Sequence, residues 1–245
     1  MAGHSKWSNI KRRKGAQDAV RGKLFTKLIK EIMVAAKMGD PDPDNNPRLR
    51  LAVDKAKSQS MPRANIERAI AKASGELQGA NYERVVYEGY GPAGVAVLVE
   101  CLTDNRNRSS SEVRHAFTKS GGTMGTSGSV AYMFQRKGLF AIVSDGLEED
   151  DVMMQTIEGG GDDVVLEDGY WIVTCPFECY DRCKKSLLEL GKKLERSELT
   201  QLPDNDVALS SEDAEKLMRM LERFDDLDDV QETYTNGNMS VLDED

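Results

Sequence analysis

Long hydrophobic runs are missing from this sequence of 245 residues, of which 39% are hydrophobic and 31% are charged. The densest apolar stretch, Val95 to Val99, has the length of a strand, whereas a membrane-spanning helix needs about 18 or more apolar residues. The amino-terminal residues also lack the apolar core of a secretory signal peptide. We therefore expect a soluble protein of the cytoplasm without a membrane partner.

Cysteine and histidine are scarce as well, with four cysteines and two histidines in the sequence. Four cysteines in a chain of this length, without secretory features, do not form a disulfide framework and suggest a reducing compartment. Cys175, Cys179 and Cys183 could supply three thiolates to a metal ion, but no fourth ligand is apparent and no Cys-X-X-Cys pair occurs. We expect core cysteines here and no metal site.

Recognisable catalytic motifs are absent: the sequence has no P-loop, no nucleophile elbow and no zinc-protease helix. Gly89 to Gly94 matches the G-X-G-X-X-G spacing of dinucleotide-binding loops. A strand rather than a helix is expected after it, and Pro92 removes a backbone amide from the phosphate cradle, so we interpret the segment as a hairpin turn. The chain is expected not to be an enzyme, and no cofactor or small-molecule substrate is indicated.

Acidic runs occur at Glu148 to Asp151 and at Asp225 to Asp229, and they could attract magnesium. Runs of like charge are usually solvated faces, and we predict that structure for both. The glycine-rich segment Glu158 to Asp163 ends in acidic residues that would repel phosphate, so we predict a turn that ends a helix.

The net charge of −9 conceals a division of the chain into two parts of opposite charge. Residues 1–74 contain 17 Lys and Arg against 7 Asp and Glu, whereas the remaining residues contain 16 against 35. Such an asymmetry indicates a surface that faces a polyanion on an otherwise soluble, self-repelling body.

The basic part has the pattern of a small helical bundle. Apolar residues recur every three to four positions over 17–38 and predict a helix that stops near Gly39. Asn46 is placed to cap a second helix with Pro47 in its first turn, and Pro62 opens a third helix that ends near Ser74.

After residue 76 the pattern changes from helices to strands. Strands are expected at 83–90, 95–102 and 130–134, with a helix at 108–119 between the last two. Residues 139–202 then predict strand, helix, strand, strand, helix, strand, which is the ferredoxin-like order. A final helix at 211–224 and a strand at 230–234 could complete the sheet that begins at Glu83.

The predicted fold class is therefore a multidomain α+β protein, in line with a length that suggests two or three compact units. A basic three-helix bundle with a flexible amino-terminal arm occupies residues 1–76. A middle α+β domain comprises residues 77–135 plus 204–245. A ferredoxin-like βαββαβ domain, residues 136–203, is inserted into the middle domain.

Basic residues dominate the first thirty positions, where only one acidic residue, Asp18, occurs. A flexible basic arm can neutralise several phosphates at once, and an aromatic side chain in it can stack on an unpaired base. The basic bias continues into the first two helices, which favours polyanion binding over a merely solvated tail. The candidate nucleic-acid-binding residues of this region are Lys6, Trp7, Lys11, Arg12, Arg13, Lys14, Arg21, Lys23, Lys27, Lys30, Arg48 and Arg50.

A second candidate group lies in the turn Asp104 to Arg108, which follows a strand and leads into a helix. Asn105, Arg106 and Arg108 offer an amide and two guanidinium groups that could bind phosphates or base edges. Asp104 or Asn105 could instead only cap the helix. Both interpretations are kept open for this turn.

Six segments of the sequence together resemble the YebC/PmpR family. They follow one another in order with few gaps, so the resemblance spans the whole chain. The cysteine-bearing helix and the acidic tail are not part of this pattern. The segments are MAGHSKW (1–7), QDAVRGK (17–23), YEGYGP (87–92), ECLTDNRNR (100–108), EVRHAF (112–117) and GTSGSVAY (125–132).

The resemblance implies a helical domain, an α+β domain and a ferredoxin-like domain inserted into the latter. It also implies nucleic-acid binding. Bacterial members of the family are usually described as transcriptional regulators that bind DNA. Mitochondrial relatives are translational activators, and some bacterial members act at the ribosome on proline-rich nascent chains.

Three hypotheses of function follow. The first is a DNA-binding transcriptional regulator, although no clear helix-turn-helix is visible. The second is a ribosome-associated translation factor that binds ribosomal RNA, whose irregular surfaces suit a basic arm with an aromatic residue equally well. The third, an enzyme that uses the acidic clusters, has the least support. The expected partner is nucleic acid, either DNA or ribosomal RNA.

Overall fold

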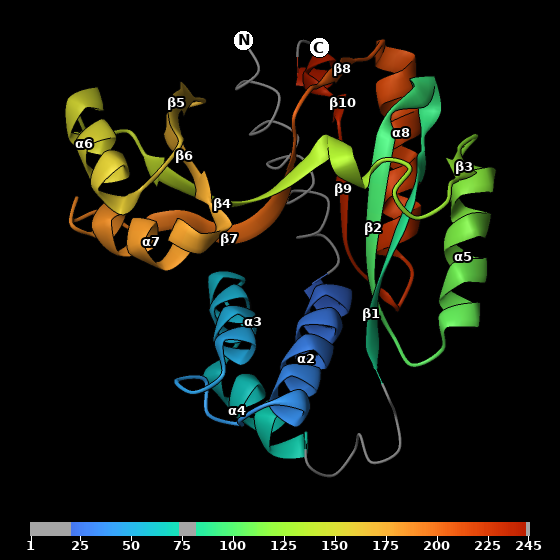
Figure 1. Cartoon of the computed structure of the whole chain (residues 1–245), viewed down its shortest axis with the longest axis horizontal. Coiled ribbons are helices and arrows are strands. Elements are labelled where there is room, and N and C mark those ends of the chain that lie inside the picture. The colour runs from blue at the N-terminus through green and yellow to red at the C-terminus, as the bar shows by residue number, and fades with distance from the viewer. Residues whose placement is uncertain (1–20, 74–81, 244–245) are drawn as a thin grey trace.

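A computed structural model describes residues 21–73 and 82–243 of the chain, and the structural account is confined to these residues. Helices and two four-stranded antiparallel sheets alternate along the chain, which confirms the predicted α+β class (Figure 1). None of the described helices is long and apolar enough to cross a membrane.

Three helices form the amino-terminal part of the described chain: α2 (Arg21–Met38), α3 (Pro47–Ser58) and α4 (Arg63–Lys72). Their apolar faces share one core, in which Ile32, Leu49 and Ile66 are buried. The Asn46 side chain caps α3 by accepting a hydrogen bond from the amide of Leu49 at 3.1 Å, as the sequence predicts.

The first sheet has the strand order β3-β1-β2-β9. β1 (Glu83–Tyr90) and β2 (Ala96–Thr103) are a hairpin closed by the short 3₁₀ turn η1 (Pro92–Gly94), so the hairpin interpretation of Gly89 to Gly94 is confirmed. β3 (Thr123–Met124) is an edge strand beside β1. β9 (Val230–Thr235) pairs with β2, as expected of the strand near the carboxyl terminus.

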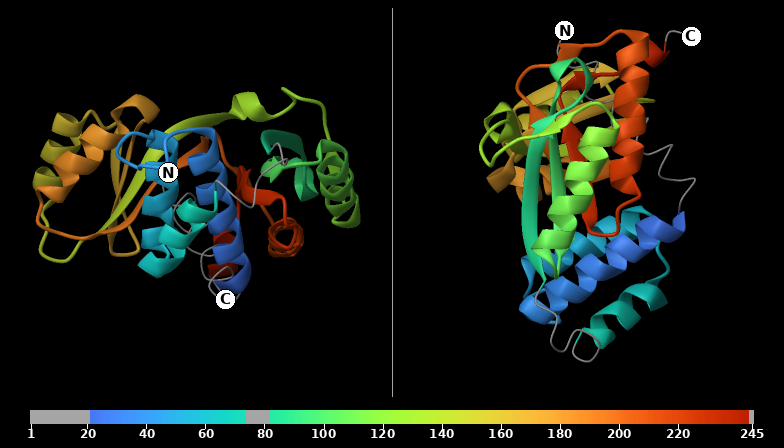
Figure 2. Two further views of the ribbon diagram at one scale, coloured as in Figure 1. Left: turned by 90° about the horizontal axis from the view of Figure 1, so that it is seen from below. Right: turned by 90° about the vertical axis from the view of Figure 1, so that its right-hand side faces the viewer.

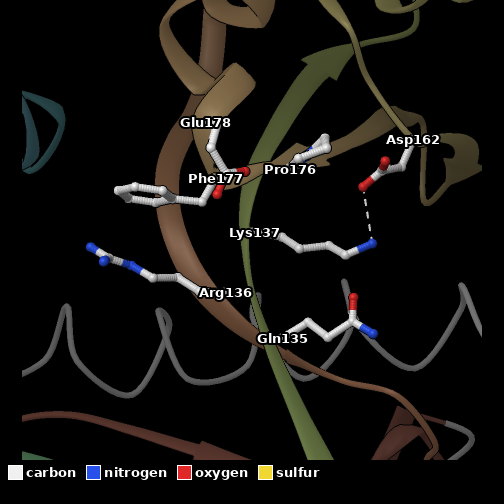
Figure 3. A pocket seen from close by; sticks show the side chains of 7 residues that line it. All are labelled: Gln135, Arg136, Lys137, Asp162, Pro176, Phe177 and Glu178. Atoms are coloured by element: carbon white, nitrogen blue, oxygen red, sulfur yellow. Dashed lines mark hydrogen bonds and ion pairs between the residues drawn. The ribbon is translucent and has the colours of Figure 1, made fainter.

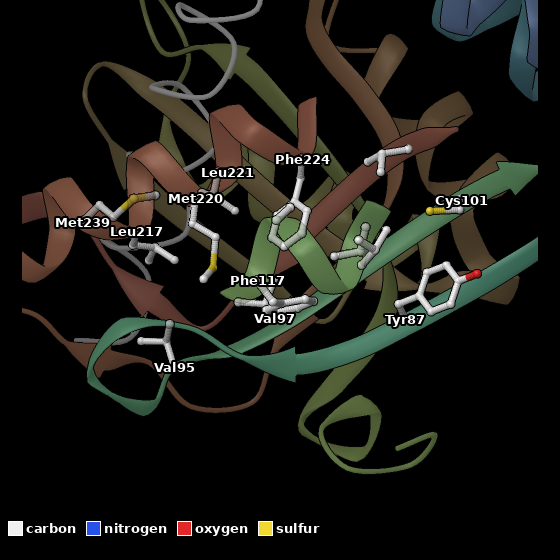
Figure 4. Close-up of a cluster of buried hydrophobic side chains, with 14 of the residues drawn as sticks. Tyr87, Val95, Val97, Cys101, Phe117, Leu217, Met220, Leu221, Phe224 and Met239 are labelled. Atoms are coloured by element: carbon white, nitrogen blue, oxygen red, sulfur yellow. The ribbon is translucent and has the colours of Figure 1, made fainter. Parts of the chain in front are cut away.

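Helices α5 (Arg106–Lys119) and α8 (Ser211–Asp225) cover one face of this sheet and lie side by side (Figure 2). Their inner faces meet at Phe117 and Phe224, whose rings are 4.8 Å apart in an edge-to-face arrangement (Figure 4). Gly89 lies beneath this contact, since a β-carbon there would come within 2.8 Å of the Phe117 ring.

The second sheet has the order β5-β6-β4-β7. Along the chain its elements run β4 (Phe134–Val143), α6 (Glu149–Gly159), β5 (Asp163–Glu167), β6 (Tyr170–Pro176), α7 (Tyr180–Leu188) and β7 (Leu194–Pro203). The observed order is therefore strand, helix, strand, strand, helix, strand. A separate core with Phe140, Val152 and Leu187 lies between this sheet and its two helices.

Strands β4 and β7 are each ten residues long and link the two sheets. Phe134, at the start of β4, packs with Ala96 and Leu98 of the first sheet, whereas Phe140 and Ile142 of the same strand lie in the core of the second. Beyond β7, the short strands β8 (Val207–Ala208) and β10 (Gly237–Asn238) pair with each other before the terminal 3₁₀ turn η4 (Ser240–Asp243).

The strand predicted at 130–134 is wrong. The chain there forms the 3₁₀ turn η2 (Ala131–Met133) and enters β4 only at Phe134. The cause is the buried carboxylate of Glu88, which accepts backbone hydrogen bonds from Gly128, Val130 and Ala131 at 2.6–2.8 Å. These amides are thus unavailable to a sheet. Burial alone would raise the pKa of Glu88, but the backbone hydrogen bonds outweigh burial and hold the pKa below its usual value.

Two further predictions of local structure are confirmed. Cys175 and Cys183 are buried in the second core, and Cys179 is partly buried beside them. The turn after Glu158 ends α6, with Gly160 in the left-handed conformation (φ 76°) that a glycine cap adopts.

We predict that Glu88→Gln lowers the free energy of unfolding by about 1–3 kcal/mol, because the amide group of glutamine places donors against backbone donors. Urea unfolding at neutral pH measures this difference. Glu83→Gln is the matched control, since Glu83 lies on the same strand but is exposed. Equal stability of the two variants would show that the Glu88 carboxylate does not anchor the loop.

Candidate nucleic-acid interface

The predicted arm residues Lys6, Trp7 and Lys11 to Lys14 lie outside the described residues. Arg21 is the first residue of α2, and its side chain also lies outside the described part of the chain. The structure therefore bears on the other candidates, which lie on α2, on α3 and at the start of α5.

Lys23, Lys27 and Lys30 lie on one side of α2 because they are spaced by four and three residues. All three contact the acidic run Asp225 to Asp229, which begins at the end of α8 and leads into β9. Lys23 Nζ is 2.6 Å from Asp226 Oδ1, and Lys27 Nζ donates to the carbonyl oxygen of Asp225 at 2.8 Å. The predicted basic face of α2 is thus largely occupied by acidic residues of the same chain.

Asp229 is the centre of this contact. It is 3% exposed, and its carboxylate accepts hydrogen bonds from Lys30 Nζ at 2.9 Å, Arg108 Nη2 at 2.7 Å and Thr103 Oγ1 at 2.9 Å. Its backbone carbonyl also accepts from the amide of Leu102. The prediction that Asp225 to Asp229 form a solvated face is therefore wrong at Asp229. The run instead neutralises cations across an internal interface.

Burial alone would raise the pKa of Asp229, but hydrogen bonds from Arg108, Lys30 and Thr103 outweigh it and hold the pKa below the usual value. Asp229 is consequently a carboxylate at neutral pH, and it joins α2, α5 and the segment before β9.

Asn105 and Arg108 have structural roles in the turn before α5. The Asn105 side chain caps α5 by accepting from the amide of Arg108 at 3.0 Å, which is the capping interpretation of this motif. Arg108 also reaches Asp104, at 2.9 Å. Arg106 is exposed and has no ion pair with the described residues. Of the two arginines of this turn, only Arg106 presents an unpaired cation.

Other charge pairs hold the helical part against both sheets. Lys55 on α3 pairs with Glu232 on β9, and Lys184 on α7 reaches Asp54 on α3 at 2.9 Å. Arg48 is 3.1 Å from the carboxylate of Glu31, which also accepts from Arg84 on β1. Arg48 is thus engaged within the molecule, although it stays partly exposed.

Several exposed cations remain without an ion pair to the described residues. Arg50 and Lys57 are seven residues apart and therefore project from the same side of α3. Arg106 and Arg114 are eight residues apart on the outer side of α5. Of these, Arg114 was not a candidate in the sequence analysis. Helical periodicity could have found it, because Val113, Ala116 and Phe117 were already expected to point inward.

The described residues include no group of three or more His, Cys, Asp or Glu side chains placed to hold a metal ion. A hydrogen bond with Cys183, together with burial, raises the pKa of the Cys175 thiol. Both cysteines are buried in the apolar core of the second sheet, where cysteine packs as a small hydrophobic side chain.

We predict that Asp229→Asn lowers the free energy of unfolding by about 2–3 kcal/mol at neutral pH, since it leaves Lys30 and Arg108 without their shared anion. Asp226→Asn is the matched control on the same segment. Its pair with Lys23 is well exposed, so a loss below about 1 kcal/mol is expected.

The pH dependence follows from the lowered pKa of Asp229. The ionised carboxylate stabilises the fold above the unfolded-state pKa of about 3.9, and this contribution is lost as the pH falls through the lower folded-state value. The gap between the original protein and Asp229→Asn, measured by urea unfolding, should therefore narrow in acid. A gap that is constant from neutral pH to below pH 3 or so would contradict the role of the charge.

Comparisons with known proteins place the whole chain in one family. Residues 5–76 match the model of the TACO1/YebC protein N-terminal domain, and residues 82–237 match that of the TACO1/YebC second and third domain. A probable transcriptional regulatory protein of Aeromonas salmonicida is 54% identical over 242 residues, with 98% of this chain and 97% of the relative covered. One of a Geobacillus species is 52% identical over the full length of both chains.

A solved structure is also similar. The crystal structure of a conserved hypothetical protein from Aquifex aeolicus has 46% sequence identity and a TM-score of 0.78, and the match covers 90% of this chain and 91% of that one. The resemblance inferred from the sequence motifs is thereby confirmed, and the chain belongs to the TACO1/YebC family.

Proposed function

We propose that this chain is a nucleic-acid-binding regulator of gene expression that acts on DNA as a transcriptional regulator. The observation that carries the proposal is the charge division, with 17 basic against 7 acidic residues in positions 1–74 and an acidic remainder. Relatives named probable transcriptional regulatory proteins also support a role in transcriptional regulation.

The proposal assigns different tasks to three units of the chain. Residues 1–76 would face the nucleic acid, while residues 77–135 with 204–245 form the central unit and residues 136–203 an inserted, ferredoxin-like unit. Separate hydrophobic cores in the helical part and in each sheet support this division. The net negative charge of these two units would limit indiscriminate binding to the polymer.

The internal ion pairs narrow the set of phosphate-binding residues. Lys23, Lys27 and Lys30 already contact the acidic segment before β9. Phosphate contacts would therefore fall mainly to the arm residues Lys6 and Lys11 to Lys14 and to the unpaired cations of α3 and α5. Such contacts give affinity and position but little sequence selectivity. In this proposal the protein acts by binding rather than by catalysis, without a cofactor.

Ultraviolet cross-linking in growing cells, with recovery under denaturing conditions and separate sequencing of attached DNA and RNA, tests the proposal. We expect enrichment of discrete promoter DNA over RNA. Cross-links concentrated in ribosomal RNA would overturn the DNA-binding form and favour a ribosome-associated translation factor instead. Background recovery of both would overturn nucleic-acid binding altogether.

The proposed phosphate contacts of the arm predict a change in the salt dependence of binding to duplex DNA. Replacing Lys11, Arg12, Arg13 and Lys14 by glutamine should reduce the slope of log affinity against log salt by roughly 3.6, because each phosphate contact contributes about 0.9. Fluorescence anisotropy at several salt concentrations measures the slope. An unchanged slope would show that the arm makes no phosphate contacts.

A smaller change is expected for α3. The double substitution Arg50→Gln with Lys57→Gln should reduce the same slope by at most about 1.8. Lys185→Gln with Lys193→Gln removes two exposed lysines from the second sheet's unit and is the matched control. If the control lowers the slope as much as the α3 variant does, the basic part of the chain is not the preferred surface.

A further inference from the structure

One pocket lies where β4 enters the second sheet, away from the basic helices. Gln135 to Lys137 of β4 form one wall, Pro176 to Glu178 at the end of β6 form the other, and Asp162 closes the end (Figure 3). Its volume is about 420 Å³. A cavity of this size is within the range, about 300–1,000 Å³, of pockets that hold small organic ligands.

The pocket contains an aromatic ring with a guanidinium group stacked over it. The Phe177 side chain is 38% exposed, although large apolar side chains are normally buried. The Arg136 guanidinium lies over this ring, 4.1 Å from its centroid. Figure 3 shows both groups on the same side of the pocket. Aromatic rings and arginine planes are the surfaces on which proteins stack unpaired nucleobases.

Two hydrogen-bonding side chains line the pocket: Glu178 lies beside the Phe177–Arg136 pair, whereas Gln135 points to the other side of β4 (Figure 3). The side chains of Gln135 and Glu178 are exposed and make no hydrogen bond with other described residues. The amide of Gln135 offers both donors and an acceptor, and the carboxylate of Glu178 offers acceptors. These are the groups that read the edges of a base.

The charges of the pocket favour a neutral ligand over a phosphate. Arg136 and Lys137 are balanced by Asp162 and Glu178. Lys137 Nζ is 3.0 Å from Asp162 Oδ2, so this cation is already paired. A planar heterocycle with polar edges fits these surroundings, whereas an isolated phosphate would meet a carboxylate on each side.

We propose that this pocket receives one unpaired base of the bound nucleic acid, stacked on the Phe177–Arg136 pair and read at its edge by Glu178. The inference rests on the proposed nucleic-acid-binding function and adds a preference to it. A base held within a continuous stack cannot enter, so the pocket selects sites where a base is unpaired or extruded.

Two labelled DNA duplexes test the inference by fluorescence anisotropy with the full chain. They are identical except that one carries a single extra, bulged nucleotide. We expect the bulged duplex to bind about tenfold more tightly, the typical effect of one base–aromatic stack. Phe177→Ala should abolish this preference without changing affinity for the plain duplex. Phe177→Trp, which keeps an aromatic ring, should retain it.

Tyr132→Ala is the matched control, because Tyr132 is an aromatic residue that is 69% exposed but does not line the pocket. Its preference for the bulged duplex should equal that of the original protein. The inference is overturned if the original protein binds both duplexes equally, or if Phe177→Ala weakens both to the same extent.

A second measurement separates failure of the pocket from failure of the proposed function. Backbone amide NMR of the labelled protein is recorded with each of the four nucleoside 5′-monophosphates at millimolar concentration. Shifts confined to the pocket residues support the pocket, and an absence of shifts there overturns it. Pocket shifts in a protein that binds neither duplex would mean a site for free nucleotides, which overturns both the inference and the proposed function.

Discussion

The contacts of one carboxylate, that of Asp229, join the helical part of this protein to its first sheet. Asp229 lies at the end of the segment between α8 and β9, where it accepts hydrogen bonds from α2, from β2 and from α5. A buried anion is costly unless several donors surround it, and here three side chains do so. The orientation of the helical part relative to the first sheet depends on this arrangement, supported by the Lys55 pair with Glu232 on β9.

The same arrangement changes how the charge of the chain should be understood. The basic amino-terminal part and the acidic remainder are not two independent surfaces, since lysines of α2 are neutralised by the segment before β9. Unpaired cations near the basic part include Arg50 and Lys57 on α3 and Arg106 and Arg114 on α5. A nucleic-acid surface built from them is smaller than the charge count suggests. In the proposed function the amino-terminal arm would therefore make a larger share of the phosphate contacts.

Strands β4 and β7 impose a second constraint. Both belong to the second sheet and pair with each other from Phe134 with Pro203 onwards, and Phe134 packs against Ala96 and Leu98 of the first sheet, so the connection between the sheets starts from two paired strands rather than from a single linker. The pocket at Phe177 lies along this connection, where Gln135 to Lys137 of β4 face the end of β6. The two walls of the pocket are therefore held together by backbone pairing within the second sheet.

The sequence by itself determined the features that depend on neighbouring residues. Periodicity placed the helices within a few residues, Asn46 signalled the cap of α3, and the order of strands and helices after residue 134 followed from local pattern. Only the tertiary structure decided which side chains are available to a ligand. Lys23 and Asp226 are 203 residues apart, Glu88 draws its donors from residues 128–131, and the pocket combines residues from separate strands. Local patterns carry the information for hydrogen bonds within a helix or turn, whereas pairings between distant segments arise only when the whole chain packs.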